Sequence, residues 1–269
     1  MVIVIIIGIV IVLFSFYLFC IIKSTKKDKE FLPLLKNYIA HRGLYNNEDV
    51  PENSLSSFEL AVKNDYRIEL DVHLTKDKEL VVVHDSNLLR MCNIDKNVEE
   101  LTYDEVKFLS LLNTDQKILK FTEVLEIIGG KVPLFVEIKY QGNYLETARK
   151  TARVLDNYKG IYAIQSFQPK VVRWFYKNRP DVIRGQLCSN FIKSNNSLIK
   201  KLSPSHLIFD FYSKPDFIAY NYKQKENLSF KLVQKITNQK IQVWAIDNIN
   251  DFNNDKNKYD MVIFERIKP

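Results

Sequence analysis

The sequence predicts an α/β protein of the (β/α)8 TIM-type barrel class, with a β-hairpin arm after the second strand and one hydrophobic helix before the first. Short runs of β-branched residues alternate with helical patterns along most of the chain, which is typical of βαβ units and a parallel sheet. One connection between runs is too short for a parallel crossover. Polar residues also stand repeatedly at the carboxyl ends of the runs, the edge at which barrels of this class gather their functional groups.

Nine runs are predicted as strands. They are Tyr38–Ala40, Arg67–Val72, Leu80–His84, Leu134–Ile138, Tyr162–Gln165, Val182–Gln186, Leu207–Asp210, Gln242–Ile246 and Met261–Phe264. Only seven residues, 73–79, separate the second run from the third, and a parallel crossover needs about a dozen. The third run therefore folds back antiparallel as a hairpin arm. Eight parallel strands remain, the number that closes a barrel of this class.

The first 22 residues carry no charged side chain and contain one glycine. As a helix they would extend for roughly 33 Å, enough to cross the hydrocarbon core of a bilayer, which is about 30 Å thick. No basic residue precedes this stretch and no small-residue cleavage site ends it, so residues 1–22 are predicted as an uncleaved transmembrane helix. Residues 23–36 follow as a basic linker, and 37–269 form the barrel. Because lysines follow the helix and none precedes it, the barrel is expected on the cytoplasmic side of the membrane.

The composition limits the class of protein further. The 269 residues carry a formal net charge of +7, which suits anionic lipid headgroups or phosphorylated substrates; the ordinary alternative is a solvated, lysine-rich surface. No nucleic-acid-binding motif is present. Three scattered cysteines make neither a disulfide framework nor a Cys-x-x-Cys metal pair. Composition leaves the oligomeric state open.

Three acidic residues are predicted to hold a cation. Glu69 and Asp71 are two positions apart on one strand and therefore point to the same, inward face. Such carboxylates repel each other unless one is protonated or a cation lies between them. With Glu137 they offer hard oxygen ligands, which suit Mg²⁺ or Ca²⁺. The alternative is a set of internal salt bridges to Arg42 and Lys139.

Two of the four histidines follow apolar runs beside these acids. His41 and His84 are predicted as a proton-transfer pair, since an imidazole with a pKa of about 6.5 can accept or donate a proton near neutral pH. The other two, His73 and His206, are expected at the surface. Arg42 offers a planar fork that can bridge phosphate oxygens, and Lys139 adds a second positive charge.

These residues belong to an ordered set of motifs that resembles the glycerophosphodiester phosphodiesterase family. The motifs are Ile39-Ala-His-Arg-Gly43, Pro51-Glu-Asn-Ser54, Ile68-Glu-Leu-Asp-Val72, Leu74-Thr-Lys-Asp77, Val82-Val-His-Asp85, Val136-Glu-Ile-Lys139 and Gln165-Ser-Phe167. The resemblance runs from about residue 39 to the end of the chain. It implies a phosphodiesterase barrel related to phosphoinositide phospholipases, with a divalent ion at Glu69, Asp71 and Glu137.

The resemblance also implies the roles of individual side chains. His41 and His84 would form the acid–base pair, and Arg42 and Lys139 would hold the phosphate. A glycerol hydroxyl would attack phosphorus, one histidine taking its proton and the other protonating the departing alcohol, before water opens the cyclic phosphate. Glu52 would orient Arg42. The glycerol side of the site would be lined by two aromatic residues, Phe167 and Trp244.

The last third of the chain departs from the family pattern. The usual Trp-Thr-Val-Asn appears as Trp244-Ala-Ile-Asp247, and the closing Ile-Thr-Asp appears as Ile263-Phe-Glu265. Both changes are expected to affect substrate identity and not the metal or histidine chemistry. Asp247 would add negative charge to the mouth of the site, unless Asn248 takes the place of the family's asparagine.

The predicted function is metal-dependent hydrolysis of glycerophosphodiesters, such as glycerophosphocholine, to glycerol 3-phosphate and an alcohol. One alternative is a lysophospholipase D that acts on lysophospholipids at the membrane. Another is a catalytically inactive barrel that serves as a membrane-tethered binding module. The pair of histidines argues against the inactive barrel, because binding alone does not need it.

Overall fold

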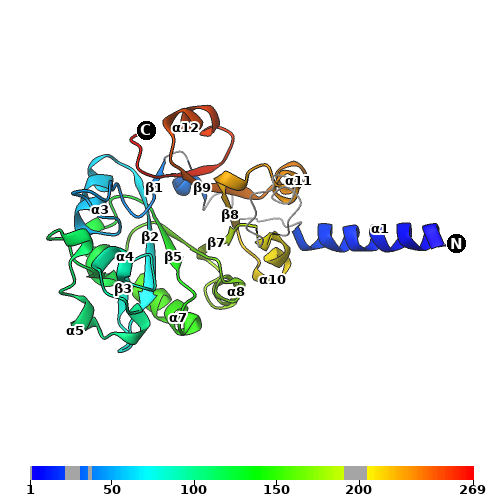
Figure 1. Cartoon of the computed structure of the whole chain (residues 1–269). Helices are drawn as coiled ribbons and strands as arrows, with labels where there is room; N and C mark the ends of the chain where they lie inside the picture. Colours follow the sequence, from blue (N-terminus) through cyan, green and yellow to red (C-terminus); the bar gives the residue numbers. More distant parts are fainter. Residues whose placement is uncertain (1, 22–30, 36–37, 191–204) are drawn as a thin grey trace.

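Eight parallel strands close into a barrel in the computed structural model, which describes residues 2–21, 31–35, 38–190 and 205–269. The barrel strands are β1 (Ile39–Ala40), β2 (Arg67–Leu74), β5 (Leu134–Ile138), β6 (Tyr162–Ser166), β7 (Ile183–Cys188), β8 (Phe217–Asn221), β9 (Lys240–Ile246) and β10 (Met261–Phe264). They are neighbours in chain order, and the ring closes where β1 pairs with both β2 and β10 (Figure 1). The predicted (β/α)8 barrel is confirmed.

The predicted hairpin arm is also present. Strand β3 (Leu80–Val82) pairs antiparallel with β2, and β4 (Leu119–Lys120) pairs antiparallel with β3. The arm ends at Val82, two residues before the predicted end, so His84 lies in the loop that follows. This loop lies beside the carboxyl end of β2, because Val83 N donates a hydrogen bond to Asp71 O over 3.1 Å.

Helices and 3-10 turns connect the strands. The α-helices are α3 (Leu55–Lys63), α4 (Leu89–Cys92), α5 (Tyr103–Val106), α6 (Phe121–Ile128), α7 (Tyr144–Leu155), α8 (Pro169–Asn178), α10 (Asp210–Ser213), α11 (Leu228–Ile236) and α12 (Ile249–Asp255). The 3-10 turns are η1 (Leu32–Leu34), η2 (Val98–Glu100), η3 (Leu111–Asn113), η4 (His206–Phe209) and η5 (Tyr222–Gln224). Helix α3 begins after the N-cap Ser54, whose side chain accepts from Ser57 N and so satisfies a backbone donor of the first turn.

The strand predicted at Leu207–Asp210 is wrong. These residues form η4 and the first residue of α10, and the barrel strand is β8, which begins at Phe217. Strand β8 pairs in parallel with β7 and β9. A run of three or four apolar residues fits a buried helical turn as well as a buried strand, so the pattern alone picked the wrong one of two adjacent apolar segments.

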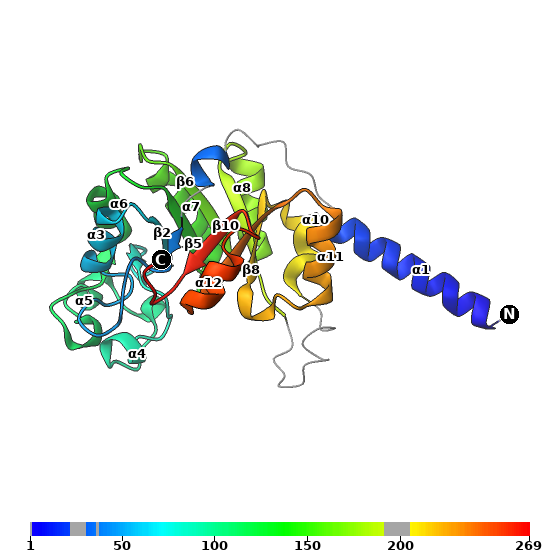
Figure 2. The ribbon, with the colours of Figure 1, turned by 90° about the horizontal axis from the view of Figure 1, so that it is seen from above.

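Helix α1 (Val2–Ile21) projects away from the barrel and meets it near α10 (Figures 1 and 2). Its last turn packs against the protein, where Tyr17 and Leu18 contact the main hydrophobic core. Across the described ranges, no helix combines the length and apolarity that a membrane span requires. The transmembrane helix predicted over residues 1–22 is therefore not confirmed, and the predicted cytoplasmic side stays a prediction.

Apolar side chains fill the interior of the barrel near the amino ends of its strands. Phe217 lies 6.2 Å from Phe31 and 6.1 Å from Phe135 between ring centroids, both edge to face. Phe31 and Leu34 are buried although the sequence assigns them to the linker; the rest of that predicted linker lies outside the described residues, apart from residues 32, 33 and 35. Because the amino end is packed, polar groups of the interior gather at the carboxyl end.

Candidate active site

Three buried carboxylates form the centre of the carboxyl end. Glu69 and Asp71 lie on β2, and Glu137 lies beside Asp71 in register on β5. Gln165 of β6 is in turn the register partner of Glu137. Each acid offers one oxygen that lies within 4.8 Å of those of the other two. The strand register thus produces the acidic cluster that the sequence predicts.

The carboxylates differ in how they are paired. Lys139 Nζ lies 2.8 Å from both Asp71 Oδ1 and Glu137 Oε1, so the salt-bridge alternative holds for these two acids. Burial alone would raise the pKa of Asp71, but Lys139, His84 and Arg42 outweigh it and lower that pKa. Glu69 differs, because burial and the neighbouring Asp71 and Glu137 raise its pKa.

A divalent cation fits this donor set. Burial and repulsion from the other two acids disfavour the charged form of Glu69, and a cation between the carboxylates would remove that penalty. Two buried amides border the cluster, since Asn53 donates to Asp71 over 2.8 Å and Gln165 to Glu69 over 3.4 Å. Within the described part of the chain, their amide oxygens have no hydrogen-bond partner. All these groups are hard oxygen donors of the kind that Mg²⁺ and Ca²⁺ prefer.

His41 follows β1 and lies between two acids. Its Nδ1 is 2.6 Å from Glu265 Oε2, and its Nε2 is 3.9 Å from Glu69 Oε2. Burial and the charge of Arg42 lower the pKa of His41, while Glu265 and Asp71 act in the opposite direction. With Nδ1 held by Glu265, Nε2 is the nitrogen that faces the acidic cluster.

Arg42 is held in a left-handed backbone conformation, with φ of 55°. Its backbone N–H donates to Glu69 over 3.2 Å, and its Nη1 donates to Glu52 over 2.7 Å. Its Nε–H lies 3.6 Å from Asp71 Oδ2 and has no acceptor within hydrogen-bond distance among the residues that the structure describes. This N–H is enclosed by the surrounding atoms, so a contact of Arg42 with a bound phosphate would use another part of its planar fork.

Glu52 is buried and shared by two arginines. It accepts from Arg42 and, over 2.6 Å and 3.0 Å, from both terminal nitrogens of Arg90. Burial alone would raise the pKa of Glu52, but the hydrogen bonds from Arg90 and Asn47 and the charge of Arg42 lower it to about 2. The structure therefore places Glu52 against Arg42, as expected, and adds Arg90, which the sequence did not single out.

His84 is paired with the adjacent acid of its own loop. His84 Nδ1 lies 2.6 Å from Asp85 Oδ1, and Asp85 also accepts from Arg90. Burial would raise the pKa of Asp85, but His84 and Arg90 lower it. The structure thus repeats at His84 the carboxylate–imidazole contact found at His41.

The surface position expected for His73 is wrong. His73 is 1% exposed, with Nδ1 2.8 Å from Glu99 Oε1 and Nε2 3.1 Å from the backbone oxygen of His84. Both ring nitrogens therefore face acceptors. His73 is two residues after Asp71 and therefore lies on the same face of β2, where Glu99 and the loop after β3 cover it.

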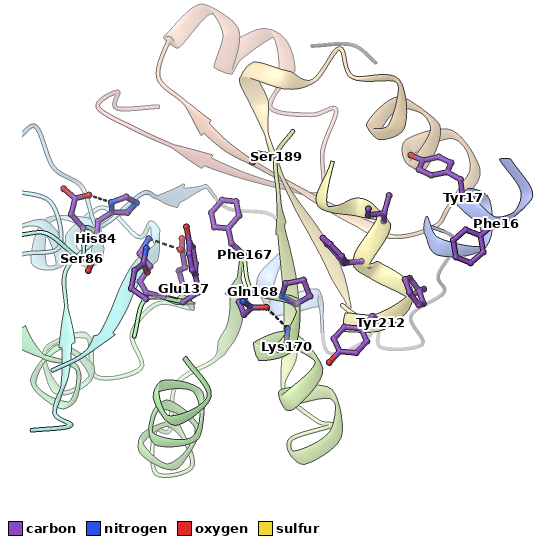
Figure 3. Close-up of a pocket in the computed structure, with 18 residues that line it drawn as sticks. Phe16, Tyr17, His84, Ser86, Glu137, Phe167, Gln168, Lys170, Ser189 and Tyr212 are labelled. Carbon is purple, nitrogen blue, oxygen red and sulfur yellow. Dashed lines mark hydrogen bonds and ion pairs between the residues drawn. The ribbon is translucent and has the colours of Figure 1, made fainter. Parts of the chain in front are cut away.

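A cavity of about 1300 Å³ opens beside the acidic cluster. His84, Glu137 and Lys139 line one end, and Phe167 projects between that end and a second, aromatic region (Figure 3). Trp244 contacts Phe167 edge to face at 5.5 Å between ring centroids, and its Nε1–H donates to Ala219 O over 3.0 Å. The two predicted aromatic residues are therefore neighbours, with Phe167 nearer the opening.

The two departures near the end of the chain have different consequences. Asp247 lies 2.7 Å from Lys223 Nζ, and Asn248 caps α12 by accepting from two backbone N–H groups of its first turn. The expectation that neither change touches histidine chemistry is wrong for Glu265, because Glu265 contacts His41 directly. No pattern within one strand indicates this pair, since its members are 224 positions apart.

Several proteins of known sequence are similar to this chain. The chain is 36% identical over 207 residues to an uncharacterised protein of Mycoplasma genitalium, which covers 74% of this chain and 73% of that protein. It is 39% identical over 109 residues to a glycerophosphodiester phosphodiesterase of Caldanaerobacter subterraneus subsp. tengcongensis, covering 38% of this chain and 44% of that one. It is 32% identical over 147 residues to a lysophospholipase D of Rattus norvegicus, covering 50% of this chain and 44% of that one. These last two matches span less than half of the relatives' length.

Solved structures share the fold. A phosphodiesterase from Oleispira antarctica, in complex with the product sn-glycerol-3-phosphate, matches with a TM-score of 0.70 and 21% identity over 86% of this chain and 93% of that one. A glycerophosphodiester phosphodiesterase from Parabacteroides distasonis matches with a TM-score of 0.68 and 23% identity over 85% and 92%. A model of the glycerophosphoryl diester phosphodiesterase family matches residues 41–248, well over half of the chain. The chain belongs to the glycerophosphoryl diester phosphodiesterase family.

Proposed function

We propose that this protein hydrolyses glycerophosphodiesters to glycerol 3-phosphate and an alcohol, with a divalent cation at Glu69, Asp71 and Glu137. The observation that carries the proposal is a pair of histidines beside one buried acidic cluster, each with Nδ1 2.6 Å from a carboxylate oxygen. Family membership supports it, as does the glycerol 3-phosphate bound by the related barrel from Oleispira antarctica.

The side chains of the site divide the proposed reaction between them. Arg42 and Lys139 hold the phosphate oxygens. A glycerol hydroxyl attacks phosphorus and loses its proton to Nε2 of one histidine, while Nε2 of the other protonates the departing alcohol. Water then opens the cyclic diester, with the histidine roles exchanged. A bound divalent cation supplies positive charge against the charge that develops on the phosphoryl oxygens.

The carboxylate partners determine which ring nitrogen is available for this chemistry. Glu265 and Asp85 can only accept at neutral pH, so Nδ1 of each histidine donates to its carboxylate. The remaining nitrogen, Nε2, is then free to accept a proton. The same contact stabilises the imidazolium that forms when it does so.

A second candidate is hydrolysis of lysophospholipids, the activity named for the relative from Rattus norvegicus. The aromatic region of the cavity favours this candidate, because a water-soluble diester has no apolar portion to place there. An inactive binding barrel is disfavoured, since both carboxylate–imidazole pairs are formed.

The proposed function is tested by a turnover panel. Glycerophosphocholine, glycerophosphoethanolamine and lysophosphatidylcholine are incubated with the full chain in Mg²⁺, in Ca²⁺ and in excess chelator, and the released alcohol and phosphate monoester are quantified. Release that depends on the metal is expected for at least one glycerophosphodiester. No release from any of them in either metal would contradict the proposal.

A further inference from the structure

The cavity continues well beyond the groups that the proposed reaction needs. Its volume of about 1300 Å³ exceeds the roughly 300–1,000 Å³ that small-molecule sites usually occupy. The charged side chains lie at one end, and Phe167 lies between them and the aromatic region (Figure 3). Pro169 of α8, a helix that contacts α10, also lines the cavity. A glycerol, a phosphate and a small alcohol leave this second region unused.

The second region is lined by apolar side chains from three separate elements. Ile208 and Phe209 come from η4, Phe211 and Tyr212 from α10, and Phe16 and Tyr17 from the last turns of α1. Phe16 is 60% exposed, Phe211 39% and Tyr212 41%. Large aromatic side chains gathered at an open surface mark a site that binds an apolar partner.

We propose that this region, residues 16–17, 208–209 and 211–212, is a subsite for a single long hydrocarbon chain carried by the phosphodiester substrate. The inference rests on the proposed function and adds the substrate class, a single-chain lipid phosphodiester. It commits to this occupant because the region is continuous with the cavity that holds Glu137 and Lys139. A hydrocarbon chain attached to a phosphate at the acidic cluster would pass Phe167 to reach the aromatic region.

Helix α1 becomes part of the substrate site in this assignment. Its last turns contact η4 and α10, and Phe16 and Tyr17 face the same cavity as His84 and Glu137. The chain-binding region is therefore incomplete without α1. Earlier turns of the helix, such as the one that carries the exposed Ile9, do not line the cavity.

The subsite is tested first by binding and without turnover. Hexyl-, octyl- and decylphosphocholine are phosphodiesters without a glycerol hydroxyl, and each is titrated below its micelle concentration into the full chain by calorimetry. If the alkyl chain of the ligand is buried in the aromatic region, Kd should fall roughly twofold to fourfold for each added methylene. A Kd that does not depend on chain length would overturn the inference.

Matched variants show where the alkyl chain of the ligand binds. F16S and F211S are expected to flatten the dependence of Kd on chain length, whereas I9S on the same helix and F108S, an exposed aromatic outside the cavity, keep it. Equal slopes in all four variants would overturn the inference. A second copy of the protein could occupy the aromatic region instead. That result would appear in light scattering as a dimer that F211S dissociates, together with a wild-type Kd that does not depend on the length of the ligand's hydrocarbon chain, and it would also overturn the inference.

A turnover arm separates this inference from the proposed function and locates the chain on the substrate. Decanoyl-lysophosphatidylcholine carries its chain on glycerol, and glycerophosphodecanol carries it on the departing alcohol. At least one should show a kcat/KM above that of glycerophosphocholine, and F16S should remove the difference. Turnover of glycerophosphocholine with no gain from either chain refutes the subsite and keeps the proposed function. Binding that depends on the length of the hydrocarbon chain, with no turnover of any diester, keeps the subsite and refutes the proposed function.

Discussion

At the scale of single residues, the site repeats one arrangement, an imidazole whose Nδ1 meets a carboxylate oxygen 2.6 Å away. His41 has this contact with Glu265, and His84 has it with Asp85. Asp85 directly follows His84 and belongs to the same motif, so the carboxylate partner of His84 could be recognised from the sequence. Glu265 reaches His41 only because β1 and β10 are adjacent in the closed barrel, and a local pattern cannot show that.

The contact with Glu265 predicts a kinetic effect. Glu265 raises the pKa of His41 against burial and the charge of Arg42, which lower it. E265Q should therefore lower the pKa of His41 further and move the limb of the pH–rate profile that reports it to lower pH. We expect kcat to fall roughly tenfold to a hundredfold, a part of the total acid–base contribution. D247N, an exposed acid paired with Lys223, is the control; an unchanged profile in E265Q would refute a role of Glu265 in orienting His41.

Glu52 predicts a pH-dependent stability. Its pKa in the folded protein is lowered from 4.5 to about 2, so its stabilising effect is fully present above pH 4.5 and is lost as the pH falls through 2. Because Arg90 is partly exposed, we expect this effect to be on the order of 2 kcal/mol. Urea unfolding of the wild type and E52Q across this pH range measures it. The difference in the free energy of unfolding between wild type and E52Q should become smaller as the pH falls. A difference that stays constant would show that the lowered pKa of Glu52 does not stabilise the fold.

At the scale of elements, strand ends and turns determine where the site residues lie. The predicted strands at β2, β5 and β10 have at least one boundary at the predicted residue, and they carry or flank the acids of the site. The predicted strand at Leu207–Asp210 failed because two apolar segments follow each other there and only pairing with β7 and β9 selects the second. The error left the acidic cluster untouched but hid η4 and α10, and with them the aromatic region of the cavity.

The turn after β1 depends on a glycine. Gly43 has φ of 81°, and a Cβ added to it would lie 2.5 Å from Ser57 Oγ and 2.8 Å from the backbone carbon of Ser57. We expect G43A to lower the free energy of unfolding by about 2 kcal/mol or more and to lower kcat by displacing Arg42. Thermal and urea unfolding test this expectation. The control G8A meets no atom within 4 Å and should cost no stability; equal stability of G43A and wild type would contradict the account of this turn.

At the scale of the whole molecule, closure of the barrel brings together residues from both ends of the chain. The eight-strand count was predictable from the alternating pattern, because one hairpin could be recognised by its short connection. The packing of α1 was not predictable, since an apolar stretch of 22 residues has the composition of a membrane helix. Only the tertiary structure shows that Tyr17 and Leu18 pack against the barrel core.

Metal binding should stabilise the whole fold, because the three carboxylates repel one another in the buried cluster. At a concentration of about 100 Kd, a ligand that binds only the folded state adds about 2.7 kcal/mol to the free energy of unfolding. We expect Mg²⁺ or Ca²⁺ to raise Tm in the wild type and not in E69Q. E126Q, a substitution on the exposed side of α6, serves as the control. A Tm that neither ion changes at millimolar concentration would argue against a cation site here.

The central claim, that His41 and His84 act as an acid–base pair at the metal-binding cluster, is tested most directly by the turnover of single histidine variants. The measurement is kcat for glycerophosphocholine in saturating metal for wild type, H41A and H84A, with folding verified by circular dichroism and Tm. General acid–base catalysis contributes about 10²–10⁴-fold, so each variant should lose at least about a hundredfold in kcat while it remains folded. A folded variant of either histidine with a kcat near that of the wild type would contradict the claim.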